Sequence, residues 1–366
     1  MSLTLTDTKF SLFKRQSCPV GAVHEPPFGN HRGYRRGRFA KCPYSDEGSM
    51  TRNEFLKTLM AAAAMAVPGS LRGQRLAAMK TYTYKSVGGC DIKLDVYGAD
   101  LSIRKPVIVW IHGGALIMQS RKAIARWLDP QNEHVVISID YRLAPETKLP
   151  GIIEDVQDAF TWIHQQGPSL LNIDAEKLIV AGGSAGGYLT LMTGFCIKPR
   201  PRALISLSGY GDIVGPWYSQ PSPFYLQTLP RISKEEALAT VGTACISEPP
   251  EKDNRGLFYH YCRQNGIWPM QVTGHDPITE PHWFDPYCPV RNVSAEYPPT
   301  VLIHGTADTD VPYEESADMD KELTRLKVDH KFISVPNGNH GIKNQRPEVQ
   351  VRIFREAMDF AKAHVG

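Results

Sequence analysis

The 366-residue sequence has little net charge and no extended region of one sign. Its 41 Lys and Arg residues against 38 Asp and Glu residues give a formal charge of +3. Residues 1–50 hold eight of the basic and four of the acidic residues, which leaves about −1 for the remainder of the chain. A surface that binds a polyanion needs clustered positive charge. This balance argues against a nucleic-acid partner.

The sequence also has no CxxC pair, no zinc-like cysteine spacing and no internal repeat. Seven cysteines are scattered through the chain, and an odd number at irregular intervals is not a disulfide framework. Buried or unused thiols are therefore expected. Cys245, Cys262 and Cys288 fall within one segment, where a single bridge could form if the protein is exported.

The first 75 residues lack the patterns found in the rest of the chain. Residues 1–49 carry Pro-Pro and a GYRRGRF run without sustained periodicity, which indicates a disordered or spurious extension. In residues 50–75 a charged start, TRNEFLK, precedes an apolar run and then Pro-Gly, as in a signal peptide. The run is too short to span a bilayer as a stable helix, so no stable membrane insertion is expected. An alanine-rich surface helix is the alternative.

The location of the protein depends on where translation starts. A start near Met50 predicts export to the periplasm or the medium, whereas an earlier start predicts a cytoplasmic protein. The TRNEFLK segment also resembles a twin-arginine export signal, but Asn53 stands where the second arginine is expected. The route of export is therefore left open.

From residue 80 to residue 366, short apolar segments alternate with helical ones. The runs PVIVWIH (106–112), HVVISID (134–140) and KLIVA (177–181) are continuous and β-branched, typical of strands buried on both faces. Strands are also expected at 81–87, 92–97, 203–208, 300–304 and 331–335, and helices at 152–165 and 349–363. This alternation predicts an α/β fold with a mostly parallel central sheet and helices on both faces.

The alternation stops once, between about residues 210 and 297. This segment is rich in Pro, Trp and Tyr, and only residues 234–241 suggest a helix. So long a departure between two late core strands predicts a cap-like insertion folded over the sheet edge, where it shapes a pocket. Its aromatic side chains either form apolar pocket walls or pack the insertion onto the core.

The motif G-x-S-x-G occurs in Gly182-Gly183-Ser184-Ala185-Gly186-Gly187. It follows the KLIVA strand and precedes a helical run at 188–195, the strand–turn–helix context of a nucleophile elbow. Such a turn closes only if Gly182 and Gly186 lack side chains, and it presents the Ser184 hydroxyl at a helix N-terminus. A phosphate cradle is the alternative. No P-loop lysine and no acidic residue at Rossmann spacing accompanies the motif.

A nucleophilic serine needs a base, and the base needs an acid to orient it. Of twelve histidines, His340 lies in the loop PNGNHG just after the last expected strand, and His304 is expected to be structural. The acid is expected in HGTADTDVP, where Asp308 is nearer the strand end and Asp310 is the alternative. Two residues apart, these carboxylates are not expected to reach the same imidazole. Asp310 would otherwise cap a helix starting near Pro312.

Acyl transfer also needs hydrogen-bond donors for the developing oxyanion. Gly113, Gly114 and Ala115 follow the strand at 106–112, in a loop of small residues whose backbone N–H groups can point at a substrate. The N–H of Ala185, the residue after the expected nucleophile, would complete the oxyanion hole. These four residues are therefore the candidate donors.

The motifs HGGA, YRLAPE (141–146), GGSAGG, HGTADTDVP and GNHG together resemble the hormone-sensitive-lipase-like and feruloyl-esterase-like branches of the α/β-hydrolases. The resemblance covers residues 80–365. Ala115 and Gly183 depart from the glycine and aspartate usual in the lipase branch, and the acid motif is closer to feruloyl-esterase-like and prolyl-oligopeptidase-like members. The resemblance implies that YRLAPE is structural, with Arg142 and Glu146 in ion pairs and Asp155 as the partner of Arg142.

The residues and the resemblance imply a serine hydrolase that cleaves small-molecule carboxylic esters through Ser184, His340 and Asp308. It would form an acyl-enzyme and need no metal or organic cofactor. A peptidase of the prolyl-oligopeptidase kind, an amidase or an acyltransferase would share these residues, although that peptidase usually carries an upstream β-propeller. A non-catalytic binding protein on the same fold normally lacks a triad member. The natural ester and the oligomeric state are not specified by the sequence.

Removing the residues before about Gln74 should leave ester turnover unchanged, because every catalytic motif lies beyond residue 110. The measurement compares kcat/KM and soluble yield of the truncated and full-length chains. A truncated chain that misfolds and loses activity would show instead that the N-terminal segment packs on the catalytic domain.

Overall fold

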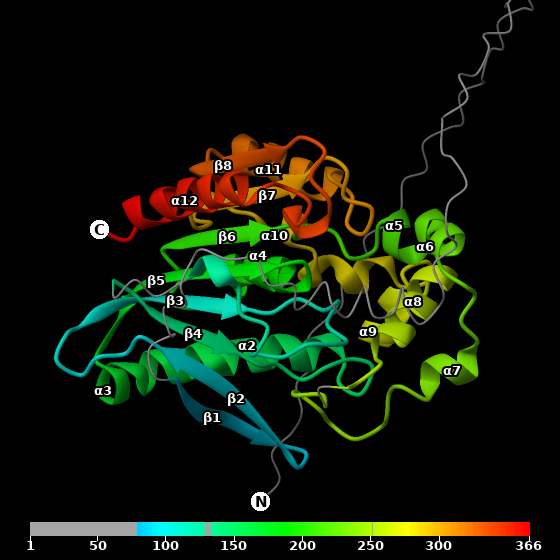
Figure 1. Ribbon diagram of the computed structural model, residues 1–366, viewed down its shortest axis with the longest axis horizontal. Coiled ribbons are helices and arrows are strands. Elements are labelled where there is room, and N and C mark those ends of the chain that lie inside the picture. Colours follow the sequence, from blue (N-terminus) through cyan, green and yellow to red (C-terminus); the bar gives the residue numbers. More distant parts are fainter. Residues whose placement is uncertain (1–78, 129–132, 251) are drawn as a thin grey trace, which may run out of the picture. The chain divides into compact units, whose positions relative to one another are not determined.

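The computed structural model describes residues 79–366 except 129–132 and 251, so the predictions for residues 1–49 and 50–75 lie outside the described residues. Eight strands form a sheet in the order β1-β2-β4-β3-β5-β6-β7-β8 (Figure 1). They are β1 (Lys80–Val87), β2 (Cys90–Tyr97), β3 (Lys105–Ile111), β4 (Val135–Ile139), β5 (Ile173–Gly183), β6 (Ala203–Leu207), β7 (Thr300–Gly305) and β8 (His330–Val335).

The sheet is antiparallel at one edge and parallel elsewhere. β1 pairs with β2 and β2 with β4 in antiparallel register, whereas β4, β3, β5, β6, β7 and β8 are parallel neighbours. The helices that pack on it are α2 (Leu149–Gln165), α3 (Gly167–Leu171), α4 (Ala185–Cys196), α11 (Glu314–Arg325) and α12 (Pro347–Ala363), with the 3-10 turn η1 (Arg126–Leu128). The predicted fold class, a mostly parallel sheet with helices, is confirmed.

Alternate residues of the central strands face two separate cores. On β3, Val107, Val109 and Ile111 belong to one buried cluster with apolar residues of α2, α4 and α11. Ile108 and Trp110 belong to the other, with apolar residues of α12 and η1. Because successive strand side chains point to opposite faces, a strand covered on both sides must be apolar throughout. This explains the continuous apolar runs in the sequence.

All eight strands expected from the sequence are present in the described residues, and β5 differs most in its bounds. It begins at Ile173, four residues before the predicted start. Ile173 and Asp174 pair with Lys105 and Pro106 of β3, ahead of an irregularity in the register. The apolar run alone does not reveal this extension of the strand, because the extension is stabilised by backbone pairing.

The insertion between β6 and β7 contains more helices than the one predicted. They are α5 (Pro216–Ser219), α6 (Pro223–Thr228), α7 (Lys234–Leu238), α8 (Gly256–Asn265), α9 (Trp268–Thr273), α10 (Pro289–Asn292) and the 3-10 helix η2 (Pro281–Tyr287). α7 is the predicted helix, and a capping box of Ser233 and Glu236 starts it. Most of the others begin with Pro in the first turn, where its missing N–H costs nothing.

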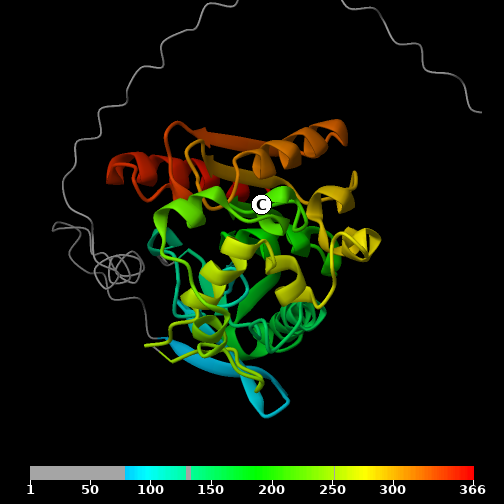
Figure 2. The same ribbon diagram turned by 90° about the vertical axis from the view of Figure 1, so that its right-hand side faces the viewer.

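These short helices gather at the carboxyl ends of the parallel strands (Figure 1), and they face the viewer in Figure 2. In an open parallel sheet, ligands bind beyond the carboxyl ends of the strands. The insertion is therefore placed where it can contact a bound molecule. Within residues 79–366, leaving out the undescribed positions, no helix is long and apolar enough to cross a membrane.

Two buried ion pairs fix the YRLAPE loop, as the family resemblance implied. Arg142 Nε donates to Asp155 on α2 at 2.7 Å. Arg255, at the start of α8, donates to Glu146 at 2.6 Å and to the carbonyl oxygen of Ala144 at 2.6 Å. The Arg255 and Glu146 side chains are only 4% and 1% exposed. This second pair ties the insertion to the core.

The five cysteines in the described ranges are free thiols. Cys262 and Cys288 are buried among apolar side chains, and burial raises the pKa of the Cys288 thiol to about 12. The bridge considered among Cys245, Cys262 and Cys288 is not formed. A protonated, enclosed thiol is a poor nucleophile, so these side chains act as small apolar residues.

Replacing Glu146 by Ala should destabilise the fold by about 3–5 kcal/mol, because it leaves the buried Arg255 guanidinium without its counter-charge. The free energy of unfolding is measured by urea denaturation of the purified protein. The matched control is Glu154→Ala, which removes a 60% exposed carboxylate from the same region and should cost less than about 1 kcal/mol. Equal losses in the two variants would contradict the anchoring role of the Arg255 pair.

Candidate active site

Ser184 lies at a sharp turn between β5 and α4, with φ 57° and ψ −123°. Its N–H donates to the carbonyl oxygen of Leu207 at 2.8 Å. A Cβ on Gly182 would lie 2.2 Å from the Gly186 oxygen, and one on Gly186 would lie 2.0 Å from the Ile111 oxygen. No side chain fits at either glycine, as the motif predicted. A serine held in so rare a backbone conformation marks a candidate functional position.

The loop after β3 lies directly against this turn. A Cβ on Gly113 would be 3.4 Å from the Cβ of Ser184. Gly114 has φ +93° and its ideal Cβ would lie 2.1 Å from the Met118 oxygen, so only glycine fits there. Ala115 adopts φ 56°, a left-handed conformation that costs a residue with a Cβ about 1 kcal/mol. The alanine at this position therefore keeps a backbone shape that glycine would adopt more easily.

Four backbone N–H groups near Ser184 have no hydrogen-bond acceptor among the described residues. Within the described part of the chain, no hydrogen bond is donated by the N–H of Gly113, Gly114 or Ala115. Ala185 is the first residue of α4, where an N–H has no intrahelical acceptor. These are the donors expected from the sequence, and they are free to bind an oxygen atom of a ligand.

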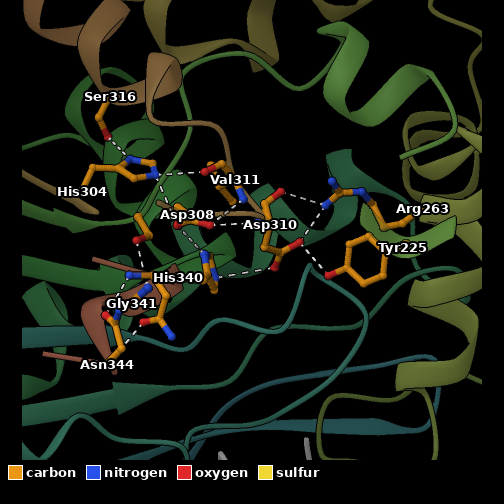
Figure 3. Close-up of polar contacts among 12 residues, drawn as sticks. Tyr225, Arg263, His304, Asp308, Asp310, Val311, Ser316, His340, Gly341 and Asn344 are labelled. Atoms are coloured by element: carbon orange, nitrogen blue, oxygen red, sulfur yellow. Dashed lines mark hydrogen bonds and ion pairs between the residues drawn. The ribbon is translucent and has the colours of Figure 1, made fainter. Parts of the chain in front are cut away.

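Asp308 and His340 are brought together by the loops that follow β7 and β8 (Figure 3). His340 Nδ1 lies 2.8 Å from Asp308 Oδ2, so the imidazole donates from Nδ1 in the tautomer that this contact favours. The Asp308 side chain is fully buried, and that of His340 is 24% exposed. One edge of the imidazole is thus fixed by a buried carboxylate while the other remains accessible.

Asp308 is held as a carboxylate by four donors. The backbone N–H groups of Asp310 and Val311 donate to Oδ1 at 2.9 and 3.0 Å. Oδ2 faces His340 and also lies 3.3 Å from Nε2 of His304. Burial opposes ionisation, but the hydrogen bonds from His304 and His340 outweigh it and hold the pKa of Asp308 well below its usual range. An ionised carboxylate therefore stands behind the imidazole.

His304 has a structural place, as expected, but its contact with Asp308 was not predicted. It is fully buried at the end of β7, with Nδ1 2.7 Å from Ser316 Oγ and Nε2 3.1 Å from the Val311 oxygen. These contacts hold the ring next to the acid. The only sequence signal for this contact was that His304 directly precedes the Gly-Thr of the acid loop. The contact itself depends on how that loop folds back toward the ring, which the sequence does not show.

Asp310 does not cap a helix, so that prediction is wrong. α11 begins at Glu314 without a side-chain cap. Asp310 instead directs Oδ2 toward His340, 3.7 Å from Nε2, so both carboxylates face the same imidazole from opposite edges. Asp308 accepts a hydrogen bond from the Asp310 N–H in a tight turn. This turn places the Asp310 side chain at the opposite edge of the His340 ring from Asp308. Spacing along the chain alone could not show this.

Three further residues were missed by the sequence analysis because they come from the insertion. Tyr225 on α6, and Tyr259 and Arg263 on α8, all donate to Oδ1 of Asp310, at 2.9, 2.6 and 2.7 Å. They lie 47–85 positions before Asp310 in the chain. The aromatic richness of the segment was the only sequence signal, and it did not indicate which rings carry a polar role.

The loop that carries His340 is fixed by its own hydrogen bonds. Asn339 and Asn344 donate from their backbone N–H groups to one another's side-chain oxygens, at 2.9 and 3.1 Å. The N–H of Gly341 donates to Ser208 Oγ at 3.1 Å, which connects the loop to the end of β6. Ser184 and His340 are not joined by a hydrogen bond in the described residues. Catalytic hydrogen bonds often shorten only when substrate binds.

In residues 79–366, apart from the positions not described, no group of three or more His, Cys, Asp or Glu residues could hold a metal ion. Ser184 instead follows β5, Asp308 and Asp310 follow β7, and His340 follows β8, while the loop after β3 carries unused N–H groups. Such a set can transfer protons and stabilise an oxyanion.

The chain shares sequence with much longer fungal enzymes. It is 29% identical over 299 residues to the non-reducing polyketide synthase Preu6 of Preussia isomera, covering 72% of this chain and 14% of that protein. It is 26% identical over 352 residues to the non-reducing polyketide synthase pkbA of Emericella nidulans, covering 79% and 14%. The chain therefore spans only about one seventh of the length of these relatives.

Several solved structures share its fold. A protein of unknown function from Staphylococcus aureus superposes with a TM-score of 0.64 at 23% identity, covering 78% of this chain and 100% of that one. The carboxylesterase EstE1, from a metagenomic library, gives 0.58 at 18% identity, covering 86% and 95%. An arylesterase gives 0.57 at 19% identity, covering 85% and 92%. At these identities the likeness shows the fold alone.

A family model described as the alpha/beta hydrolase fold matches residues 108–344. The match runs from β3, through the turn at Ser184 and the insertion, to the loop after His340. It therefore includes all the candidate residues described above. The resemblance seen in the sequence motifs is confirmed, and the chain belongs to the alpha/beta hydrolase fold family.

Proposed function

We propose that the protein is a serine hydrolase that cleaves carboxylic esters, with Ser184 as nucleophile, His340 as general base and Asp308 as the acid that orients it. The observation that carries the proposal is the 2.8 Å contact between His340 Nδ1 and a fully buried Asp308 carboxylate. This contact leaves Nε2 unprotonated and able to accept the Ser184 proton. The strained turn at Ser184 supports the same assignment.

The electrostatics suit a base that becomes charged during the reaction. Burial lowers the pKa of His340, but the hydrogen bond to Asp308 and the charges of Asp308 and Asp310 outweigh burial and raise it above its ordinary value of 6.5. The imidazolium that forms when Ser184 attacks is therefore stabilised. The same imidazolium then returns its proton to the departing alcohol oxygen.

The free N–H groups of Gly113, Gly114 or Ala115, with that of Ala185, would hold the negative oxygen of the tetrahedral intermediate. Because Gly113 packs against Ser184, an ester carbonyl attacked by Oγ would have its oxygen near this loop. Removing one such donor typically costs about 3 kcal/mol of transition-state stabilisation. Water activated by His340 would then hydrolyse the acyl-enzyme.

Proteins that share the fold include esterases, so ester hydrolysis is the chemistry that we propose among those that these residues allow. Structures described as an arylesterase and as a carboxylesterase share the fold over 85% or more of this chain. Peptidases, amidases and acyltransferases could use the same groups, and only substrate trials separate them. A non-catalytic binding protein is disfavoured, because Ser184, His340 and Asp308 are all present.

The match to polyketide synthases favours a second candidate, release or transfer of an acyl group from a thioester. The matched stretch covers 72% of this chain, although it is only 14% of Preu6. A serine nucleophile can attack a thioester as it attacks an oxygen ester. The acyl-enzyme would be the same, and only the leaving group would differ.

A substrate panel tests both candidates. p-Nitrophenyl esters from acetate to palmitate, feruloyl esters and acetyl-xylan are compared with an N-acetylcysteamine thioester of the preferred acyl chain. Ester hydrolysis predicts the highest kcat/KM on an oxygen ester. A thioester turned over far faster than every oxygen ester would favour the second candidate, and no turnover of any of them would overturn both.

Ser184→Ala and His340→Ala should each reduce ester turnover to near background without unfolding the protein, because the two residues act as one unit. The measurements are kcat with the best p-nitrophenyl ester, labelling by a fluorophosphonate probe, and thermal unfolding. The Ser184→Ala variant should not label. Retention of more than a few per cent of wild-type turnover by it would refute the assignment of the nucleophile.

Asp308→Asn should keep the fold and lose about 10³–10⁴-fold in kcat, because an amide can favour the tautomer in which Nε2 carries a proton. Steady-state kinetics of the purified variant measure the loss, with circular dichroism to check folding. Asp310→Asn is the informative comparison, since it alters the other carboxylate near the ring. A nearly normal Asp308→Asn beside an inactive Asp310→Asn would move the acid two residues along the chain.

A further inference from the structure

Asp310 is a second carboxylate at the candidate site, and its two oxygens have different surroundings (Figure 3). Oδ1 accepts three hydrogen bonds, from Tyr225 Oη, Tyr259 Oη and Arg263 Nη1, at 2.9, 2.6 and 2.7 Å. Arg263 Nη1 also donates to the backbone oxygen of Asp310 at 3.0 Å. Donors from two helices of the insertion thus fix the orientation of this side chain.

Oδ2 of Asp310 receives no hydrogen bond from the described residues. His340 Nε2 lies 3.7 Å from Oδ2, too far for a direct hydrogen bond. The Asp310 side chain is 20% exposed, whereas that of Arg263 is 3% exposed. A carboxylate oxygen with unused lone pairs therefore stands at the accessible edge of the imidazole.

Arg263 serves to hold Asp310, since its own surroundings leave little room for a ligand. Four aromatic rings enclose its guanidinium, with centroids between 5.0 and 5.7 Å from Cζ; they belong to Trp217, Tyr218, Tyr225 and Tyr259. Burial opposes ionisation of Asp310, but the charges of His340 and Arg263 and the hydrogen bond from Tyr259 outweigh it and lower the pKa of Asp310. Asp310 is therefore ionised at neutral pH.

In the proposed reaction, Nε2 of His340 gives its proton to the oxygen of the leaving alcohol. That oxygen must come within hydrogen-bond distance of Nε2, about 2.6–3.2 Å. A polar group two or three carbons along the alcohol from that oxygen would then be next to Asp310 Oδ2. The acyl part of the ester, which stays on Ser184, lies on the other side of the scissile bond.

We propose that Asp310 selects the alcohol half of the substrate, and that its free Oδ2 accepts a hydrogen bond from a hydroxyl or ammonium group two or three carbons from the ester oxygen. The preferred substrates are thus esters of polyols or amino alcohols. Alcohols that carry a carboxylate at this position are repelled by the same charge. This inference rests on the proposed esterase function and adds the class of leaving group to it.

The test compares three esters of one acyl chain, the chain that the wild-type enzyme prefers. Their alcohols are propanol, ethane-1,2-diol and 3-hydroxypropanoate, which present a methyl, a hydroxyl and a carboxylate at nearly the same place. kcat/KM is measured for wild type, Asp310→Asn and Asp310→Ala. Asp318→Asn is the matched control, because this exposed carboxylate on α11 pairs with Lys321 and has no contact with His340.

The wild-type enzyme should prefer the 2-hydroxyethyl ester over the propyl ester by about 10-fold or more, the usual worth of a hydrogen bond to a charged group. It should disfavour the 2-carboxyethyl ester by a similar factor. Both differences should shrink to within about 3-fold in Asp310→Ala and remain in Asp318→Asn. Asp310→Asn should lose the discrimination against the carboxylate, since the negative charge is gone.

The pH dependence of kcat/KM is a second measurement. It would not change if Asp310 had only a structural role. The charged groups that face His340 are Asp308, Asp310 and Lys343, with Arg263 behind Asp310. The two carboxylates raise the pKa of His340 and Lys343 lowers it. Because the base must be neutral, kcat/KM falls as the pH drops through this pKa. In Asp310→Asn the fall should occur at lower pH than in the wild type.

The failures of the two proposals are distinguishable. If the wild type hydrolyses the propyl and 2-hydroxyethyl esters equally well while Ser184→Ala hydrolyses neither, the esterase function stands and the role of Asp310 is overturned. That role is also overturned if the preference persists in Asp310→Ala. If the wild type hydrolyses no ester, the proposed function itself is refuted. The comparison of the three esters on the wild-type enzyme needs no variant, so the proposal can be overturned even if the Asp310 variants misfold.

Discussion

The close contact between the start of α4 and the end of β3 is the constraint on which the candidate site depends. A single carbon added to Gly186 would lie 2.0 Å from the oxygen of Ile111, closer than any real contact. The turn that presents Ser184 is therefore pressed against the strand whose following loop carries the free N–H groups. Ser184 and the N–H groups of this loop keep one relative position because no side chain separates the two backbones.

The electrostatic arrangement follows from this frame. Ser184 follows β5, and His340 lies in the loop after β8, at the same edge of the sheet. The parallel register places the loop after β7 beside it, so Asp308 meets the Nδ1 edge of the ring. Asp310, from the same short loop, meets the other edge. The imidazole is therefore surrounded by more negative charge than a single acid would supply.

Local patterns in the sequence predicted most of this architecture. The buried strands, the turn at Ser184 and the loops that carry His340 and Asp308 all depend on residues within a few positions of one another, or on the fixed order of strands. The position of Asp310 and the contacts of Tyr225 and Arg263 could not be predicted, because they join segments 47 or more positions apart. The short helices of the insertion were missed because they contain few apolar repeats.

The carboxylate of Asp310 belongs to a core loop, whereas its three hydrogen-bond donors belong to the insertion. Under the proposed role of Asp310, substrate preference and proton transfer therefore cannot evolve separately in this protein. An insertion transplanted from a relative would bring new walls for the substrate, but without Tyr225, Tyr259 and Arg263 it would leave an unsupported negative charge beside the imidazole. Successful chimeras must exchange the loop after β7 together with the segment that covers it.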